Sequence, residues 1–311
     1  MVPNTLAFWS YLIFLIPSII CSLFVLYHLL FDRVLRHALH NHVIIVVLFI
    51  VVIYEITVYP WMLYYYQYQN ISGIPNIFCT IRTFLDWNLC ITQTILISWA
   101  AIERHILIFH DKWVSTKKKR FFIHYLPLIV LVLYCFIFYI IVYFFPPCEN
   151  LFDHSSLTCV YSCLYDIYAF AIWQTVAHQI LPVLIIIVFS TALLLRVIWQ
   201  KFRIHQSIQW RKYRKMTIQL LSVSLLYLIF YLPLSVAHTI LLWNLMDDIY
   251  FEFQDYAIYF SYFVIPLFPF VCILSLPELR TKLIHTLHLQ RRRIVPEIIL
   301  IKAPVYKHMN I

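Results

Sequence analysis

Apolar residues in this 311-residue chain gather in seven long runs that short polar segments separate. Each run reaches the roughly 20 residues that an α-helix needs to cross a bilayer. The runs do not alternate polar and apolar residues, as the wall of a membrane β-barrel must. The pattern therefore predicts an all-α, seven-transmembrane helix bundle. The predicted spans are residues 8–30, 43–66, 79–108, 121–145, 168–202, 214–243 and 253–276, followed by a short amphipathic, membrane-parallel helix at 277–289 and a tail at 290–311.

Composition supports a membrane environment for most of the chain. Of its residues 63% are hydrophobic and 12% are charged, against roughly 25% charged in a typical soluble domain. Only short loops join the runs, so residues 1–311 are expected to form one domain. The first run has no basic segment before it and no small-residue cleavage site after it, so we expect a retained span and not a signal peptide.

Positive charge is distributed so unevenly that it predicts an orientation in the membrane. Of the 23 Lys and Arg residues, 22 lie in the first, third and fifth connections, at the ends of the runs that border them, or after the seventh run, and only Arg82 lies on the opposite side. The positive-inside rule then places the N-terminus outside and the C-terminus in the cytoplasm, as in a multi-pass plasma-membrane protein. The net charge of +9 thus indicates topology and contact with anionic lipid, and no nucleic-acid partner is expected.

The opposite face carries features that are typical of an extracellular surface. Its connections are acidic and would attract cations. Four cysteines, Cys79, Cys148, Cys159 and Cys163, lie on this side, where an oxidising compartment permits two disulfides whose connectivity the spacing does not fix. Asn70 begins an Asn-Ile-Ser glycosylation sequon on the same side.

The third run carries a distinctive pair of ends. Cys79 stands at its outer end and Glu103, Arg104 and His105 at its inner end, with 25 residues from the cysteine to the arginine. This interval resembles the third helix of the rhodopsin-like G-protein-coupled receptors, which have a cysteine and an acid-Arg-aromatic triplet at these places. The resemblance implies that Glu103, Arg104 and His105 contact a heterotrimeric G protein.

Further landmarks follow the same family in order. Pro182 matches the proline of the fifth helix, and Tyr231-Leu232-Pro233 resembles the Trp-x-Pro switch of the sixth. Pro269 and the 277–289 segment resemble the seventh-helix proline and the short helix after it. By this resemblance Pro233 and Pro269 are the expected activation hinges.

The family resemblance also implies a disulfide between the third helix and the second outer loop. Cys79 is the third-helix cysteine, and Cys159 is its expected partner, with Cys163 as the alternative. Cys148 is then available for the second bridge.

Several positions depart from the family. The second-helix aspartate that binds sodium would stand at Val51, and the nearest acid is Glu55, one turn further out. The seventh-helix Asn-Pro-x-x-Tyr motif keeps only Pro269. Some members restrain the third-helix arginine with an acid in the sixth helix, where this chain has Tyr213. Without that restraint, basal signalling is expected.

Asp86 is the candidate for ligand contact. A carboxylate within a span costs roughly 2.5–3.5 kcal/mol on insertion scales, so it should face a cavity or a partner. Asp86 matches the counter-ion of amine receptors and some peptide receptors, and Tyr262 matches the tyrosine that bonds this acid in amine receptors. The alternative is that Asp86 only pairs with Arg82 or Tyr262 and contacts no ligand. A basic peptide or other cationic ligand is expected, with an amine receptor as the alternative. The expected ligand-binding residues are Asp86, Tyr231, Tyr262, Gln174 and His178.

Other functional classes were weighed against the receptor. Retinal needs a lysine in the seventh span, and residues 253–276 contain none, which excludes conventional retinal attachment. Histidines on the cytoplasmic side resemble those of di-iron membrane enzymes, but no two histidines are adjacent. A transporter is a further alternative, although inverted repeats are not visible. The chain is therefore expected not to be an enzyme and to need no metal or cofactor.

Overall fold

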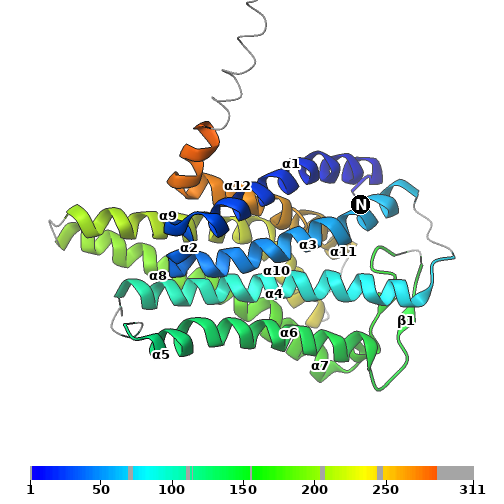
Figure 1. Cartoon of the computed structure of the whole chain (residues 1–311). Helices are drawn as coiled ribbons and strands as arrows, with labels where there is room; N and C mark the ends of the chain where they lie inside the picture. The colour runs from blue at the N-terminus through cyan, green and yellow to red at the C-terminus, as the bar shows by residue number, and fades with distance from the viewer. Residues whose placement is uncertain are drawn as a thin grey trace, which may run out of the picture.

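The computed structural model consists of long helices that run side by side (Figure 1). It describes residues 2–68, 73–109, 113, 115–154, 156–203, 207–243 and 248–285, and it places their side chains except at 200–203, 207–216, 242, 248 and 249. The predicted glycosylation site Asn70, the segment 286–311 and the side chain of Tyr213 lie outside this description.

Helices make up nearly all of the described chain. In chain order they are α1 (Asn4–Phe31), α2 (Arg33–His37), α3 (Leu39–Tyr68), α4 (Asn76–Phe109), α5 (Lys117–Arg120), the π-helix η2 (Phe121–Tyr125), α6 (Leu126–Phe144), the 3₁₀-helix η3 (Cys163–Asp166), α7 (Tyr168–Thr175), the π-helix η4 (Val176–Ile180), α8 (Leu181–Arg203), α9 (Ser207–Phe230), α10 (Leu232–Leu242), α11 (Asp248–Ser261) and α12 (Val264–Ser275). Residues 277–285 are also helical and turn away from the line of α12 (Figure 1). They coincide with most of the helix expected at 277–289.

The bundle has two distinct ends. One end carries the N-terminus and a short antiparallel hairpin of β1 (Leu151–Phe152) and β2 (Val160–Tyr161), and we call it the hairpin end (Figure 1). The opposite end carries the C-terminal turn of α4, and we call it the Arg104 end. Helix α4 packs against α3, α6, α8 and α9, so it runs through the middle of the bundle.

Four helical segments of the described chain are long and apolar enough to cross a membrane, or six if each of two bent pairs is one span. The four are Asn4–Phe31, Leu39–Tyr68, Lys117–Phe144 and Tyr168–Trp199, and the pairs are Thr217–Phe230 with Leu232–Leu241 and Tyr250–Ser261 with Val264–Ser275. These six correspond to six of the predicted spans and are consistent with a multi-pass membrane protein.

The remaining predicted span, residues 79–108, the third in chain order, does not meet the same test, so a seven-span bundle is not confirmed. Its helix α4 is 34 residues long, but it carries charges and amides along much of its length. Many of these polar side chains are buried against neighbouring helices, as Asp86 and Arg104 show. Average hydropathy underestimates a helix whose polar residues face protein and not lipid.

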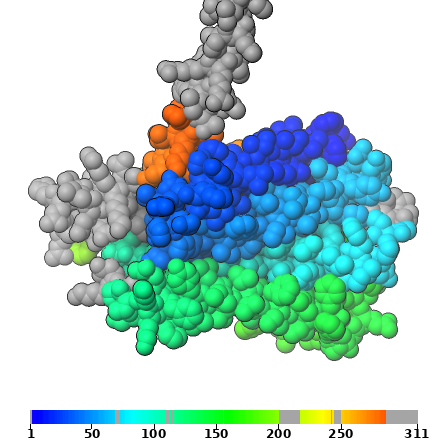
Figure 2. All heavy atoms as spheres, viewed as in Figure 1, coloured from blue at the N-terminus to red at the C-terminus, as the bar shows by residue number. Residues whose placement is uncertain are grey.

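The faces that α1 and α6 turn outward are apolar. Ile13 and Ile20 of α1 and Leu133 and Ile137 of α6 are each more than half exposed. Figure 2 shows α1, α3, α4 and α6 together on one face, coloured from blue to green. Large apolar side chains on the outside are what a lipid environment requires.

Two bends interrupt the last long helices. The first, of 42°, separates α9 from α10 at Tyr231, next to the predicted hinge Pro233. The second, of 45°, separates α11 from α12. The predicted hinge Pro269 is instead inside α12. Pro266 explains the position of the second bend, because it has no N–H to bond the carbonyl of Tyr262.

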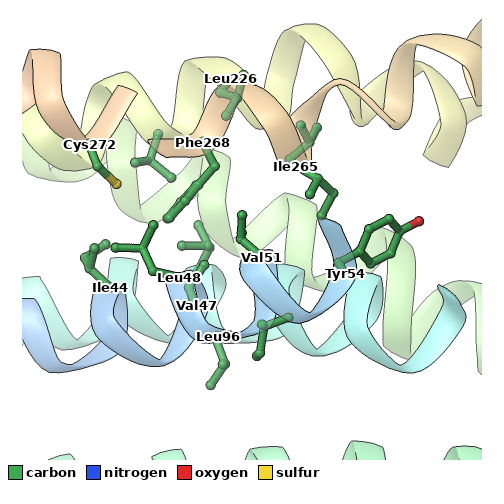
Figure 3. Packing of buried hydrophobic residues seen from close by; sticks show 14 of the residues in the cluster. Ile44, Val47, Leu48, Val51, Tyr54, Leu96, Leu226, Ile265, Phe268 and Cys272 are labelled. Carbon is green, nitrogen blue, oxygen red and sulfur yellow. The ribbon is translucent and has the colours of Figure 1, made fainter. Parts of the chain in front are cut away.

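The core between α3 and α12 is apolar. Figure 3 shows side chains of α3 meeting those of α4, α9 and α12. The labelled residues are Ile44, Val47, Leu48, Val51, Tyr54, Leu96, Leu226, Ile265, Phe268 and Cys272. Val51, where the receptor resemblance would place a sodium-binding acid, is fully buried in this apolar cluster.

Candidate functional site

A cavity lies in the half of the bundle nearer the hairpin end. It has about 770 Å³ of empty space, part of it open to solvent. It is lined by Tyr54, Asp86, Trp87, Cys90, Ile91, Gln93, Thr94, Thr158, Gln179, Tyr227, Tyr231, Leu234, His238, Ile258, Ser261, Tyr262, Val264 and Ile265. The lining is mainly aromatic and aliphatic with a few polar groups, which is the composition of a small-molecule site.

Asp86 is the centre of a buried polar cluster at one end of this cavity. The hydroxyl of Tyr54 donates to its Oδ1, and the hydroxyl of Tyr262 donates to its Oδ2 at 3.0 Å. Arg82, one turn earlier in α4, places Nη2 3.2 Å from the same Oδ2. The two pairings considered from the sequence, with Tyr262 and with Arg82, thus occur together.

The partners of Asp86 change the charge that the cavity presents. Both Asp86 and Arg82 are buried, at 6% and 3% exposure. A buried carboxylate is tolerated when a cation and hydrogen-bond donors satisfy it. Because Arg82 supplies that cation from the same helix, the cluster is neutral overall.

Aromatic rings surround this cluster on the side of α1 and α12. The hydroxyl of Tyr59 donates to the backbone carbonyl of Tyr262 at 2.7 Å, which is the carbonyl that Pro266 leaves without its helical donor. Tyr11 donates to the carbonyl of Tyr259 at 2.8 Å. These bonds fix the broken segment between α11 and α12, and with it the position of Tyr262.

The sequence-predicted ligand residues divide into two groups in the structure. Asp86, Tyr231 and Tyr262 line the cavity together. Gln174 and His178 do not, because they face α6 instead. Gln174 Nε2 donates to the hydroxyl of Tyr139 at 2.6 Å, and His178 Nε2 lies 2.8 Å from the hydroxyl of Tyr134.

The π-helix η4 accounts for this difference. It inserts one wider turn just before Pro182, which has no N–H to bond the carbonyl of His178. Within η4, His178 faces α6 whereas the next residue, Gln179, lines the cavity. Sequence spacing along a regular helix therefore did not identify Gln179.

Several polar residues of the lining, besides Tyr54, were not predicted. Gln93, Gln179 and His238 each place a buried side-chain atom in the lining that has no hydrogen-bond partner in the protein. A signal was available for one of them, because Gln93 follows Asp86 by seven residues, or two helical turns, and so shares its face of α4. Gln179 and His238 come from other helices.

The Arg104 end holds a second buried polar group. Arg104 Nη2 donates to Oε1 of Gln219 in α9 at 2.7 Å, and His105 Nε2 lies 3.0 Å from the carbonyl of Phe189. Glu103 bonds Nδ1 of His124. Glu103 and Arg104 therefore have their hydrogen-bond partners on different neighbours, because successive side chains of a helix point about 100° apart.

The Glu103 contact continues toward the surface through a second histidine. His124 Nε2 lies 2.8 Å from Nδ1 of His42, and His42 Nε2 lies 2.9 Å from the carbonyl of Arg36. This series of hydrogen-bonded side chains begins at the carboxylate of Glu103 and ends at the backbone carbonyl of Arg36, and both of these groups are hydrogen-bond acceptors.

Two disulfides hold the loop at the hairpin end. One joins Cys79 to Cys159, and the other joins Cys148 to Cys163. Thr83 of α4 donates to the carbonyl of Thr158, the residue of this loop that lines the cavity. The first bridge and this bond together fix the loop over the cavity.

Within the described residues, no group of three or more His, Cys, Asp or Glu side chains could hold a metal ion. No protein-family model matches the sequence, and no curated protein matches it. The likeness to receptors therefore rests on the residues quoted from the sequence.

Proposed function

We propose that this chain is a seven-helix membrane receptor that passes a signal from an extracellular ligand to a cytoplasmic G protein. In this proposal α4 also spans the membrane, as the third of seven spans and at the centre of the bundle, and the hairpin end is extracellular. Its support is the charge distribution along the sequence, the six apolar spans and the Cys79 to Arg104 interval.

One structural observation carries the proposal. Two helices each connect the cavity to the Arg104 end. Helix α4 has Asp86 in the cavity wall and Arg104 18 residues later, about 27 Å along the axis. The bent pair α9–α10 has Tyr231 in the wall and Gln219, the partner of Arg104, 12 residues earlier.

This connection suggests how binding would be transmitted. A ligand that contacts Tyr231 at the bend favours a different angle between α9 and α10. The change moves Gln219 away from Arg104 and opens a groove at the cytoplasmic end, where a helix of the G protein binds. A ligand shifts this equilibrium only by its higher affinity for the open state.

The class of ligand needs a separate argument. The expectation of a basic peptide or other cationic ligand depends on Asp86. Because Arg82 already gives Asp86 a countercharge at 3.2 Å, a cationic ligand would have to displace Arg82. The amine-receptor alternative meets the same obstacle.

The proposal is tested by expressing the chain with a promiscuous G protein and screening neutral amphipathic molecules, amines and amidated peptides. An agonist response that Arg104→Ala abolishes at equal surface expression supports the receptor function. A response that survives this substitution, or plasma-membrane expression without any response, contradicts it.

A further inference from the structure

The polar groups of the cavity differ in how well the protein satisfies them. Asp86 is bonded by Tyr54 and Tyr262 and paired with Arg82. Two turns along the same face of α4, Gln93 is only 1% exposed, and neither its amide oxygen nor its amide nitrogen makes a hydrogen bond of ordinary geometry, although the hydroxyl of Tyr227 lies beside the amide. The carboxylate of Asp86 is therefore satisfied by protein groups, whereas the amide of Gln93 still has hydrogen-bonding capacity for a ligand.

Two other helices bring open groups to the same lining. Gln179 of η4 is 3% exposed, and its Oε1 has no partner in the protein. His238 of α10 has no partner at Nδ1. Buried polar atoms left unpaired are unfavourable, so native proteins rarely keep them without a reason such as ligand contact.

The side-chain groups of the lining that lack a hydrogen bond indicate which kind of ligand would complement them. A primary carboxamide such as that of Gln93 donates from its nitrogen and accepts at its oxygen. A second amide, which has one carbonyl and one N–H, is its natural partner. Oε1 of Gln179 can accept a further N–H or O–H, and the nearby Trp87, Leu234 and Ile265 suit an apolar body.

We propose that the cavity binds a neutral ligand through an amide group held by Gln93 and Gln179, and not an ammonium group held by Asp86. The inference rests on the proposed receptor function for its biological meaning, but its chemistry concerns the cavity alone. Arg82 and Asp86 then serve to neutralise and shape the wall. The ligand carries no net charge where it meets the protein.

Cys90 allows the charge of the cavity to be measured without a known ligand. It is a free cysteine, half-buried, and it lines the cavity. The rate of its modification can be compared for the cationic 2-aminoethyl, the anionic 2-sulfonatoethyl and the neutral methyl methanethiosulfonates. Each rate, measured on purified protein in detergent, is divided by the rate of the same reagent with 2-mercaptoethanol, and Cys90→Ala identifies the background.

The neutral wall predicts a cation-to-anion rate ratio within about threefold of one. Arg82→Met should raise this ratio at least tenfold by leaving Asp86 unpaired, and Asp86→Asn should lower it by leaving Arg82 unpaired. A tenfold preference for the cationic reagent in the unmodified protein overturns the proposal. So does a failure of the methyl reagent to label Cys90, because the residue would then not line an accessible cavity.

The amide itself is tested by a matched pair of probes. N-acetyltyramine and tyramine share one skeleton and differ in whether the nitrogen is a neutral amide or an ammonium. N-acetyltyramine is expected to protect Cys90 from the methyl reagent at concentrations at least tenfold lower than tyramine. Gln93→Leu should weaken that protection at least tenfold while leaving the cation-to-anion ratio unchanged.

Any of three results would overturn the amide assignment. These are that tyramine protects Cys90 better than N-acetyltyramine does, that neither probe protects it, or that Gln93→Leu leaves the protection unchanged. None of these readings uses a G protein. If the probe results are as expected but the protein does not couple to a G protein, the cavity assignment stands and the receptor function is wrong. If the protein couples but tyramine protects Cys90 better, the receptor function stands and the cavity assignment is wrong.

Discussion

Arg104 of α4 and Gln219 of α9 are joined by a hydrogen bond of 2.7 Å, and both side chains are buried. The contact holds together two of the helices that line the cavity. Gln219 is neutral, so this bond to the arginine is not an ion pair. Restraint of this kind is easier to release than a buried ion pair.

The bridge between Cys79 and Cys159 is expected to stabilise the fold more than the one between Cys148 and Cys163. The first joins residues 80 apart and the second residues 15 apart. Chain entropy alone favours the longer bridge by about 1.5 kcal/mol. The double variant Cys79→Ser/Cys159→Ser should therefore lower the melting temperature and the surface expression more than Cys148→Ser/Cys163→Ser. The reverse order would show that the longer bridge does not hold the loop over the cavity.

Arg82 and Asp86 should behave as a coupled pair. Asp86→Leu leaves a buried cation, and Arg82→Met leaves a buried carboxylate, so each single change should cost about 3–5 kcal/mol. The double variant replaces both charges with apolar groups and should recover most of that loss. Thermal unfolding of the three variants in detergent measures the coupling. Additive effects would mean that the two side chains do not form a pair.

Asp32 provides a pH-dependent attachment outside the spans. Its carboxylate bonds Lys282, in the helix at 277–285, and accepts from the backbone N–H of Val34 at 2.9 Å. The bond from Lys282, followed by that from Val34, lowers the pKa of Asp32 below its ordinary value of 3.8. The stabilisation is therefore complete above that value and is lost as the pH falls through the lowered pKa.

Acidification below about pH 4 should accordingly loosen the helix at 277–285. Hydrogen exchange of this segment, compared at each pH with the Asp32→Asn variant, measures the effect. Asp32→Asn should exchange faster at neutral pH and show no acid transition, whereas Arg280→Gln, an exposed change in the same segment, should behave like the unmodified chain. An acid transition that persists in Asp32→Asn would assign it to another group.

The spans that could be predicted are those whose signal is local. An apolar run of 20 residues determines its own helix in lipid, so six predicted spans correspond to candidate spans in the structure. Helix α4 shows the limit of that signal. Its polar residues are buried by other helices, and only the structure shows which helices these are.

Side-chain partners were harder to predict than helices. The contact of Asp86 with Tyr262 followed from matching positions in the family. Glu103 and Arg104 are adjacent in the sequence, yet their partners, His124 and Gln219, are 21 and 115 residues away. Gln179, and not the predicted His178, lines the cavity because of one π-helical turn, which the pattern of apolar residues does not reveal.

The Arg104–Gln219 bond allows the receptor proposal to be tested without a ligand. Gln219→Glu replaces the neutral partner with an acid, so it should hold Arg104 more tightly and lower basal coupling at least threefold. Arg104→Ala removes the group that we propose to meet the G protein and should abolish coupling. Arg280→Gln, exposed in the helix that follows α12, is the control that should keep the rate of the unmodified chain.

The most direct measurement is ligand-free nucleotide exchange by purified G-protein heterotrimers, one of each class, on membranes that contain these variants at equal surface density. The unmodified chain should exceed membranes that lack it with at least one heterotrimer, Gln219→Glu should fall below it, and Arg104→Ala should equal the background. The proposed function would be contradicted if the unmodified chain gave only background exchange with every heterotrimer. It would also be contradicted if all the variants gave equal exchange.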